Sequence, residues 1–79
     1  MTPARVVLVT RVGCHLCDDA RAVVADVCAR TGVTWVEHDV DSLPDLRDRF
    51  TDLVPVVLVD GEEQARYVVD ARRLARALR

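Results

Sequence analysis

The sequence contains no lysine, no surplus of positive charge and no long hydrophobic run. All 11 basic residues are arginine, 13 residues are acidic, and the net charge is −2. Proteins that bind nucleic acid neutralise phosphates with surplus cations, so we expect no nucleic-acid partner. The longest apolar runs span four residues, as at 6–9, whereas a membrane-spanning helix needs about 20. We therefore expect no membrane span, no secretory signal and a cytoplasmic location.

Cysteine is too scarce to build a disulfide framework. The chain has three cysteines, an odd number, and no secretory signal is expected. Its 79 residues suffice for one domain, which we take as residues 1–79. A composition that is 51% hydrophobic and 30% charged is typical of a folded domain and too apolar for disorder. We expect one small domain that acts as a monomer.

In the first half of the sequence, the pattern of hydrophobic residues changes from one typical of a strand to one typical of a helix. A continuous, β-branched run at residues 5–10 predicts a buried strand. After Gly13 the apolar spacing becomes helical. The residues that share the apolar face of this helix are Leu16, Ala20, Val23, Val24 and Val27. Gly32 is a natural end for the helix, and residues 33–38 predict a second strand.

The stretch after the second strand predicts a short helix and a third strand. Ser42 is predicted to be the N-cap, with Pro44 in the first turn. The apolar face of this helix would consist of Leu43, Leu46 and Phe50. Residues 56–59 form another apolar, β-branched run and predict a buried strand.

The last part of the chain predicts a hairpin and a final helix. Asp60-Gly61 is a strong hairpin turn, and residues 62–69 would form an edge strand. Asp70 is predicted to cap a helix with one apolar face, made by Ala71, Leu74, Ala75 and Leu78. The complete order is β-α-β-α-β-β-α. Because the first βαβ unit should be parallel and the hairpin antiparallel, we expect an α/β fold with a mixed four-stranded sheet and helices on both faces.

Two cysteines, Cys14 and Cys17, lie where the first strand leads into the first helix. Unpaired main-chain N–H groups and the helix dipole stabilise a thiolate there. Arg11, and His15 when protonated, would add positive charge. The spacing places the two side chains on neighbouring positions of one turn, so a disulfide can close with little movement. We expect Cys14 to be exposed and nucleophilic, and Cys17 to be the buried thiol that resolves a mixed disulfide.

Two other interpretations of the pair compete with this one. Both cysteines could be small buried hydrophobic residues, although this does not require the strand–Gly–Cys-X-X-Cys–helix context. The pair could also be half of a zinc site. Cys28 lies about 16 Å further along the helix at ~1.5 Å per residue, too far to complete that site. We therefore expect no metal site within one chain, and we assign Cys28 to the core.

Three stretches, "RVGCHLC", "LVPVVLVDG" and "DARRLARAL", resemble the glutaredoxin branch of the thioredoxin-like superfamily. The resemblance covers essentially the whole chain and is closest to short glutaredoxin-like proteins with a Cys-His-Leu-Cys active site. It implies a thioredoxin-like fold. It also implies that Cys14 attacks and Cys17 resolves, and that the catalytic chemistry needs no metal or organic cofactor.

The same resemblance implies further substrate-binding residues. Pro55 would be a cis-proline facing the active site, and the backbone of Val54 would pair with an extended substrate. Arg11 fits the basic position before the cysteines, and Asp70 matches the acidic helix cap at which glutathione binds. The usual Gly-Gly pair before the last helix is absent, and Val68 and Val69 stand there. His15 and Leu16 also replace the usual Pro-Tyr between the cysteines.

These features predict a thiol-disulfide oxidoreductase that reduces protein or small-molecule disulfides through Cys14 and Cys17. Glutathione, another low-molecular-weight thiol or a thioredoxin-type reductase would supply the electrons. Two alternatives remain: a redox-sensing or binding module, and a dimer bridged by an iron–sulfur cluster with a small thiol as extra ligand.

Overall fold

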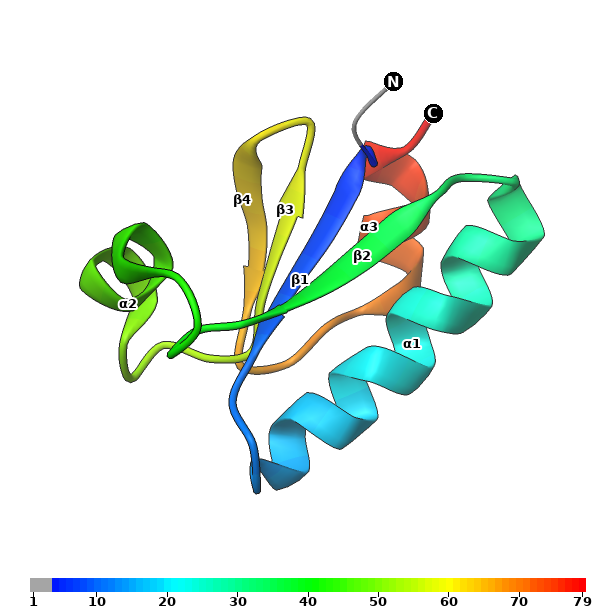
Figure 1. The fold of residues 1–79 in the computed structure, drawn as a ribbon. Coiled ribbons are helices and arrows are strands. Elements are labelled where there is room, and N and C mark those ends of the chain that lie inside the picture. The colour runs from blue at the N-terminus through cyan, green and yellow to red at the C-terminus, as the bar shows by residue number, and fades with distance from the viewer. Residues whose placement is uncertain (1–3) are drawn as a thin grey trace.

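The computed structural model describes residues 4–79 of the chain, and its centre is a mixed four-stranded sheet (Figure 1). The strands are β1 (Val6–Thr10), β2 (Trp35–Asp39), β3 (Val56–Val59) and β4 (Glu62–Arg66). Their spatial order is β2-β1-β3-β4. β1 is parallel to β2 and antiparallel to β3, and β3 is antiparallel to β4. The expected mixed sheet is therefore confirmed.

Helices cover both faces of the sheet, as the sequence predicts. They are α1 (His15–Thr31), α2 (Pro44–Phe50) and α3 (Ala71–Ala77). α1 and α3 lie on one face, and α2 lies at the other side of the sheet (Figure 1). The element order β-α-β-α-β-β-α is as predicted, and the arrangement is the thioredoxin-like fold that the family resemblance implied.

The central strands are buried on both faces, which explains their continuous apolar runs. Val6 and Leu8 of β1 belong to the cluster formed with α1 and α3, together with Val57 and Val59 of β3. The alternate residues belong to a second cluster beneath α2, which contains Val9, Val40, Phe50, Val56 and Leu58. The side-chain alternation of a strand therefore divides one apolar run between two cores.

The turns end the elements close to the predicted positions. Gly32 ends α1 with a φ of 70°, in the left-handed region that favours glycine. Asp60 and Gly61 have φ values of 52° and 87°, as a two-residue hairpin turn requires. The Asp60 carboxylate also accepts two hydrogen bonds from the guanidinium of Arg5, at 3.1 and 3.0 Å. This ion pair joins the hairpin to the start of β1.

Two predicted side-chain roles were wrong. Leu43, and not Ser42, is the N-cap of α2. The Ser42 hydroxyl instead donates to the Asp39 carbonyl at 2.7 Å, because the preceding turn engages it first. Leu16 was expected on the buried face of α1 but is 46% exposed. The first turn of α1 extends beyond the end of the sheet (Figure 1). Leu16 belongs to this turn, and its side chain lines a small surface hollow with Tyr67 and Val68.

Two strand boundaries also differ from the prediction. β2 begins at Trp35, two residues later than expected. β4 ends at Arg66 and not at residue 69, because Tyr67 has a φ of 68° and leaves the extended conformation. The chain from Tyr67 to Asp70 then crosses to α3. These residues therefore lie at the same end of the sheet as the start of α1 (Figure 1).

Candidate functional site

Cys14 is the N-cap of α1, at the end of a short loop that follows β1. Gly13 turns this loop with a φ of 81°. The Cys14 Sγ accepts a hydrogen bond from the Cys17 backbone N–H at 3.2 Å. The Cys14 carbonyl accepts from the Asp18 N–H at 3.3 Å, which starts the helix. The thiol therefore takes the place that a serine or aspartate side chain takes at an ordinary N-cap.

The two thiols of the pair differ in exposure. Cys14 is partly exposed, whereas Cys17 is completely buried. Burial, and then the neighbouring Cys14 side chain, raise the pKa of Cys17 to about 11. At neutral pH Cys17 therefore holds its proton while Cys14 is within reach of solvent. The predicted difference in exposure, with Cys14 accessible and Cys17 buried, is therefore confirmed.

The Val54–Pro55 segment lies beside the end of β1. Val9 pairs with Val56, so the residues just before Val56 lie next to Thr10, which leads into the cysteine loop. The Val54–Pro55 bond is cis, as the resemblance implied. The Pro55 carbonyl accepts from the Tyr67 N–H at 2.8 Å. Within residues 4–79, no hydrogen bond uses the N–H or C=O of Val54.

Arg11 and His15 lie on either side of Cys14 in the sequence, in different surroundings. The Arg11 guanidinium pairs with Asp41 at 3.1 Å and with Asp52 at 3.5 Å. Its charge is thus already balanced by two carboxylates. The His15 side chain is exposed in the first turn of α1.

Asp70 uses its carboxylate within the protein. Its Oδ1 accepts from the backbone N–H groups of Arg72 at 2.9 Å and Arg73 at 3.0 Å. The hydrogen bond from Arg73 is the main cause that lowers the pKa of this carboxyl. The residues before Asp70 point to opposite sides, because Val69 is buried in the core and Val68 is 73% exposed. A valine side chain therefore projects where the family pattern has glycine.

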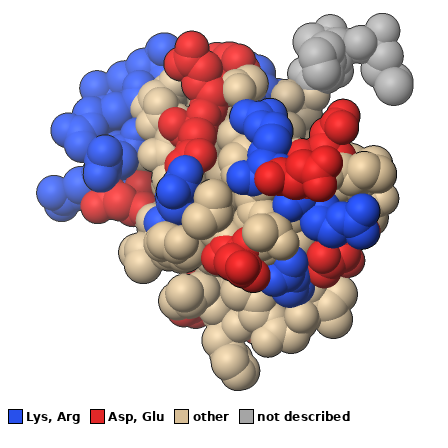
Figure 2. Space-filling view, turned by 90° about the vertical axis from the view of Figure 1, so that its left-hand side faces the viewer, with Lys and Arg blue, Asp and Glu red and all other residues tan. Residues whose placement is uncertain are grey.

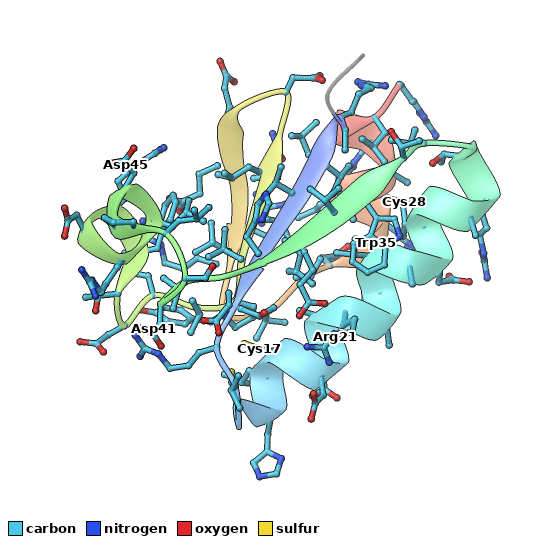
Figure 3. The ribbon with its side chains drawn as sticks, viewed as in Figure 1. Cys17, Arg21, Cys28, Trp35, Asp41 and Asp45 are labelled. Carbon is cyan, nitrogen blue, oxygen red and sulfur yellow. The ribbon has the colours of Figure 1, made fainter. Side chains whose placement is uncertain are left out.

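A polar network next to Cys17 was missed by the sequence analysis. Arg21, one turn after Cys17, donates to Glu37 of β2 at 2.7 Å and to Asp18 at 2.9 Å. The buried Thr10 donates its hydroxyl proton to the same Glu37 at 2.8 Å. Arg21 is the main cause that lowers the pKa of Glu37, and Figure 3 shows Arg21 on α1 near Cys17. Arg21 follows Cys17 by four residues, a spacing that places two side chains next to each other on a helix. This spacing could have predicted that Arg21 lies near Cys17.

Cys28 lies near the other end of α1, apart from the pair (Figure 3). It is 2% exposed and belongs to the core cluster of α1 and α3. Burial raises the pKa of its thiol. The assignment of Cys28 to the core is confirmed.

Across residues 4–79, no group of three or more His, Cys, Asp or Glu side chains could hold a metal ion. Over the same residues, no helix has the length and apolar character needed to cross a membrane.

Comparison with known proteins identifies the family. Residues 5–79 match the model of the glutaredoxin-like domain (DUF836), so the chain belongs to this glutaredoxin-like family. Among curated proteins, uncharacterized proteins of Mycobacterium bovis and Mycobacterium tuberculosis are 37% identical to it. Each alignment covers 94% of this chain and 81% of the relative.

Solved structures agree with the fold. The structural genomics target protein XcR50 from X. campestris is 30% identical with a TM-score of 0.73, covering 92% of this chain and 93% of that one. Protein Ne2328 from Nitrosomonas europaea is 24% identical with a TM-score of 0.76, covering 96% and 92%. The holo form of glutaredoxin C1 from Populus tremula x tremuloides is 18% identical with a TM-score of 0.54, covering 92% and 72%. The second and third likenesses concern the fold alone.

Proposed function

We propose that the protein is a thiol-disulfide oxidoreductase that works through Cys14 and Cys17. The observation that carries the proposal is the contact at the start of α1. The partly exposed Cys14 Sγ accepts the Cys17 N–H at 3.2 Å, and Cys17 is buried directly behind it. A negative charge on the Cys14 sulfur is stabilised by this hydrogen bond and by the positive end of the helix dipole.

The first step transfers the substrate to the protein. The Cys14 thiolate attacks one sulfur of a substrate disulfide, and a new S–S bond forms between them. The substrate S–S bond breaks, and its other sulfur leaves as a thiolate that takes up a proton. Cys14 then has no negative charge, so one cause of the high pKa of Cys17 is removed.

The second step releases the substrate. Cys17 loses its proton and attacks the Cys14 Sγ, which breaks the mixed disulfide. The substrate sulfur leaves as a thiolate, and the protein holds a Cys14–Cys17 disulfide. Two electrons have then passed from the protein to the substrate. A small thiol such as glutathione, or a thioredoxin-type reductase, returns two electrons and restores the dithiol.

The backbone of Val54, which makes no hydrogen bond within residues 4–79, gives the proposal a candidate substrate-binding edge. An extended segment on either side of a substrate cysteine can pair with the Val54 N–H and C=O as an added strand. This pairing would hold the substrate sulfur beside Cys14. Disulfide-containing proteins are therefore the proposed substrates.

The test begins with the disulfide itself. We expect mild oxidation to give a Cys14–Cys17 bond, identified by mass spectrometry of proteolytic fragments, with Cys28 remaining a free thiol. The oxidised protein is then offered glutathione with its reductase, or thioredoxin reductase, and NADPH loss identifies the electron donor. Failure to form the Cys14–Cys17 bond under any oxidising condition would contradict the proposed function.

A further inference from the structure

Exposed apolar side chains gather around the cysteine pair. Within residues 4–79, six large hydrophobic side chains are exposed. Four of them lie in the segments that surround Cys14 and Pro55, and we call these four the apolar rim. They are Val12 (87% exposed), Val68 (73%), Leu16 (46%) and Tyr67 (43%). The other two, Val36 and Leu43, lie elsewhere, on β2 and before α2.

The rim is continuous from α1 to the segment after β4. Leu16, Tyr67 and Val68 line one small hollow of about 70 Å³. The Tyr67 N–H is bonded to the Pro55 carbonyl at 2.8 Å, which joins this hollow to the Val54–Pro55 edge. Val12 lies two residues before Cys14, in the loop that joins β1 to α1, and is exposed. A ligand bound to Cys14 and Val54 would therefore contact apolar side chains.

The backbone holds part of the rim in an exposed position. Tyr67 has a φ of 68°, which is uncommon for a residue other than glycine. The Val68 N–H bonds to the Arg66 carbonyl at 2.8 Å, so Arg66–Val68 forms a tight three-residue turn. Since this turn ends β4, the side chains that follow Arg66 leave the sheet. The exposure of Val68 is thus a consequence of main-chain geometry.

Two arginines next to the rim are already engaged by carboxylates. Arg11, which precedes Val12, pairs with Asp41 and Asp52. Arg66, which precedes Tyr67, donates two hydrogen bonds of 3.0 Å to Glu63. Asp19 lines the same hollow as Leu16. Figure 2 shows mainly uncharged residues at the lower end of the molecule, where β1 leads into α1.

A second hollow beside Val68 contains charged residues of both signs, which include Asp70 and Arg73. The charge of Arg73 helps to lower the pKa of the Asp70 carboxyl. That carboxylate is already bonded to two backbone N–H groups. Glutathione carries two carboxylates and one ammonium group, and so has a net negative charge.

We propose that the apolar rim selects extended peptide disulfides whose cysteine is flanked by uncharged apolar residues, in preference to glutathione disulfide. Apolar flanks would cover Val12, Leu16, Tyr67 and Val68, while the peptide backbone pairs with Val54. Glutathione would leave the rim exposed and place its carboxylates beside Asp19 and the paired arginines. This inference rests on the proposed function, because the selected ligand is the substrate of the Cys14–Cys17 pair.

The experiment compares three disulfides as oxidants of the reduced protein. They are the symmetric disulfides of acetyl-Val-Cys-Leu-amide, of acetyl-Glu-Cys-Glu-amide and of glutathione. Acid quenching and mass spectrometry give the second-order rate constant for Cys14–Cys17 disulfide formation. Each rate constant is divided by that for dithiothreitol with the same disulfide, which corrects for intrinsic reactivity. We expect the corrected value for the apolar peptide to exceed that for glutathione by about 10-fold or more, as burial of one or two apolar side chains implies.

The rim itself is tested by a double variant, Val12→Ser with Val68→Ser. Both side chains are highly exposed, so the fold should tolerate serine, and circular dichroism verifies this. We expect the preference for the apolar peptide over glutathione to fall by about 5-fold or more. The matched control is Val36→Ser on β2, which should retain the wild-type preference.

The outcomes separate this inference from the proposed function. Equal corrected rates, or faster oxidation by glutathione, would overturn the inference and leave the oxidoreductase proposal in place. An unchanged preference in the double variant would also overturn it. Failure of all three disulfides to oxidise the protein would contradict the proposed function itself.

Discussion

The first and last turns of α1 place the same functional group in opposite surroundings. Cys14 caps the N-terminus, where its Sγ accepts a main-chain N–H at 3.2 Å and is partly exposed. Cys28 lies near the C-terminus, 2% exposed, and its carbonyl accepts the N–H groups of Gly32 and Val33. The helix dipole favours a thiolate at the first end and opposes it at the second. Position along the helix, more than residue type, therefore separates an accessible capping thiol from a core thiol.

The largest effect is expected from removing the thiol at the N-terminal end. Cys14→Ser should lower the rate of disulfide reduction by at least about 10³-fold, because a serine hydroxyl neither ionises near neutral pH nor forms an S–S bond. The measurement is the rate of NADPH-coupled disulfide reduction with the identified electron donor. Cys28→Ala is the matched control and should keep the wild-type rate. Activity that survives in the Cys14 variant would move the reactive centre elsewhere.

Removing Cys17 should separate the two steps. Cys17→Ser keeps the attacking thiol but lacks the resolving one, so a mixed disulfide on Cys14 should accumulate. Mass spectrometry of the intact variant after reaction with a peptide disulfide should show one peptide per protein. We expect turnover to fall about 10-fold or more when no external thiol can resolve the intermediate. If no adduct forms, the order of the two thiols is reversed or the pair is not the reactive centre.

A pH series compares buried Cys17 with an ordinary cysteine. In the unfolded chain a cysteine titrates near 9.0, whereas the folded-state pKa of Cys17 is about 11. Between these values unfolding releases a proton, so the free energy of unfolding should decrease as pH rises from 9 to 11. We expect a loss on the order of 2 kcal/mol from this group. Denaturant unfolding of the reduced protein measures it.

Cys17→Ala supplies the control for the pH series. It removes the titrating thiol, so its stability should decline less steeply over the same pH interval than that of the wild type. Parallel declines in the two proteins would show that the pKa of Cys17 is not raised in the folded state.

The smallest effect is expected at the C-terminal end of α1. Cys28→Ala removes one buried sulfur from the core and should lower the free energy of unfolding by about 1 kcal/mol. The rate of disulfide reduction should not change, since Cys28 lies outside the site. Thermal unfolding and the reduction assay measure both quantities. A large loss of activity without a loss of stability would assign Cys28 a redox role and remove the contrast between the two ends.

Much of the fold could be predicted because the spacing of hydrophobic residues along the sequence differs between helices and strands. The runs at 5–10 and 56–59 indicated buried strands, and the spacing after Cys14 indicated a helix that ends at Gly32. Leu16 has the spacing of the buried face of α1, but it is exposed. It lies in the first turn of the helix, which extends beyond the end of the sheet (Figure 1). Ser42 departed from the prediction because two local hydrogen bonds compete for a serine hydroxyl, and the turn to Asp39 prevailed over the cap. Neither result can be read from spacing alone.

The candidate site likewise has some features that the sequence predicted and others that it did not. The positions of Cys14 and Cys17 at a strand-to-helix junction followed from the sequence, and the cis conformation before Pro55 followed from the family resemblance. The hydrogen bonds from Arg21 and Thr10 to Glu37 did not, because they join three elements far apart in the chain. The pairing of Arg11 with Asp41 and Asp52 is equally non-local, and it changed the expected electrostatics of the loop.

By itself, the sequence determined the order of elements, the two-sided burial of the central strands and the presence of two thiols in the first turn of a helix. These follow from periodicity, turn residues and helix capping, which act over a few neighbouring residues. Only the tertiary structure decided which arginines are already paired, that Tyr67 lies beside Pro55, and that Leu16, Tyr67 and Val68 line one hollow. Such features depend on contacts between segments whose separation in space is set by the sheet, and no local pattern encodes them.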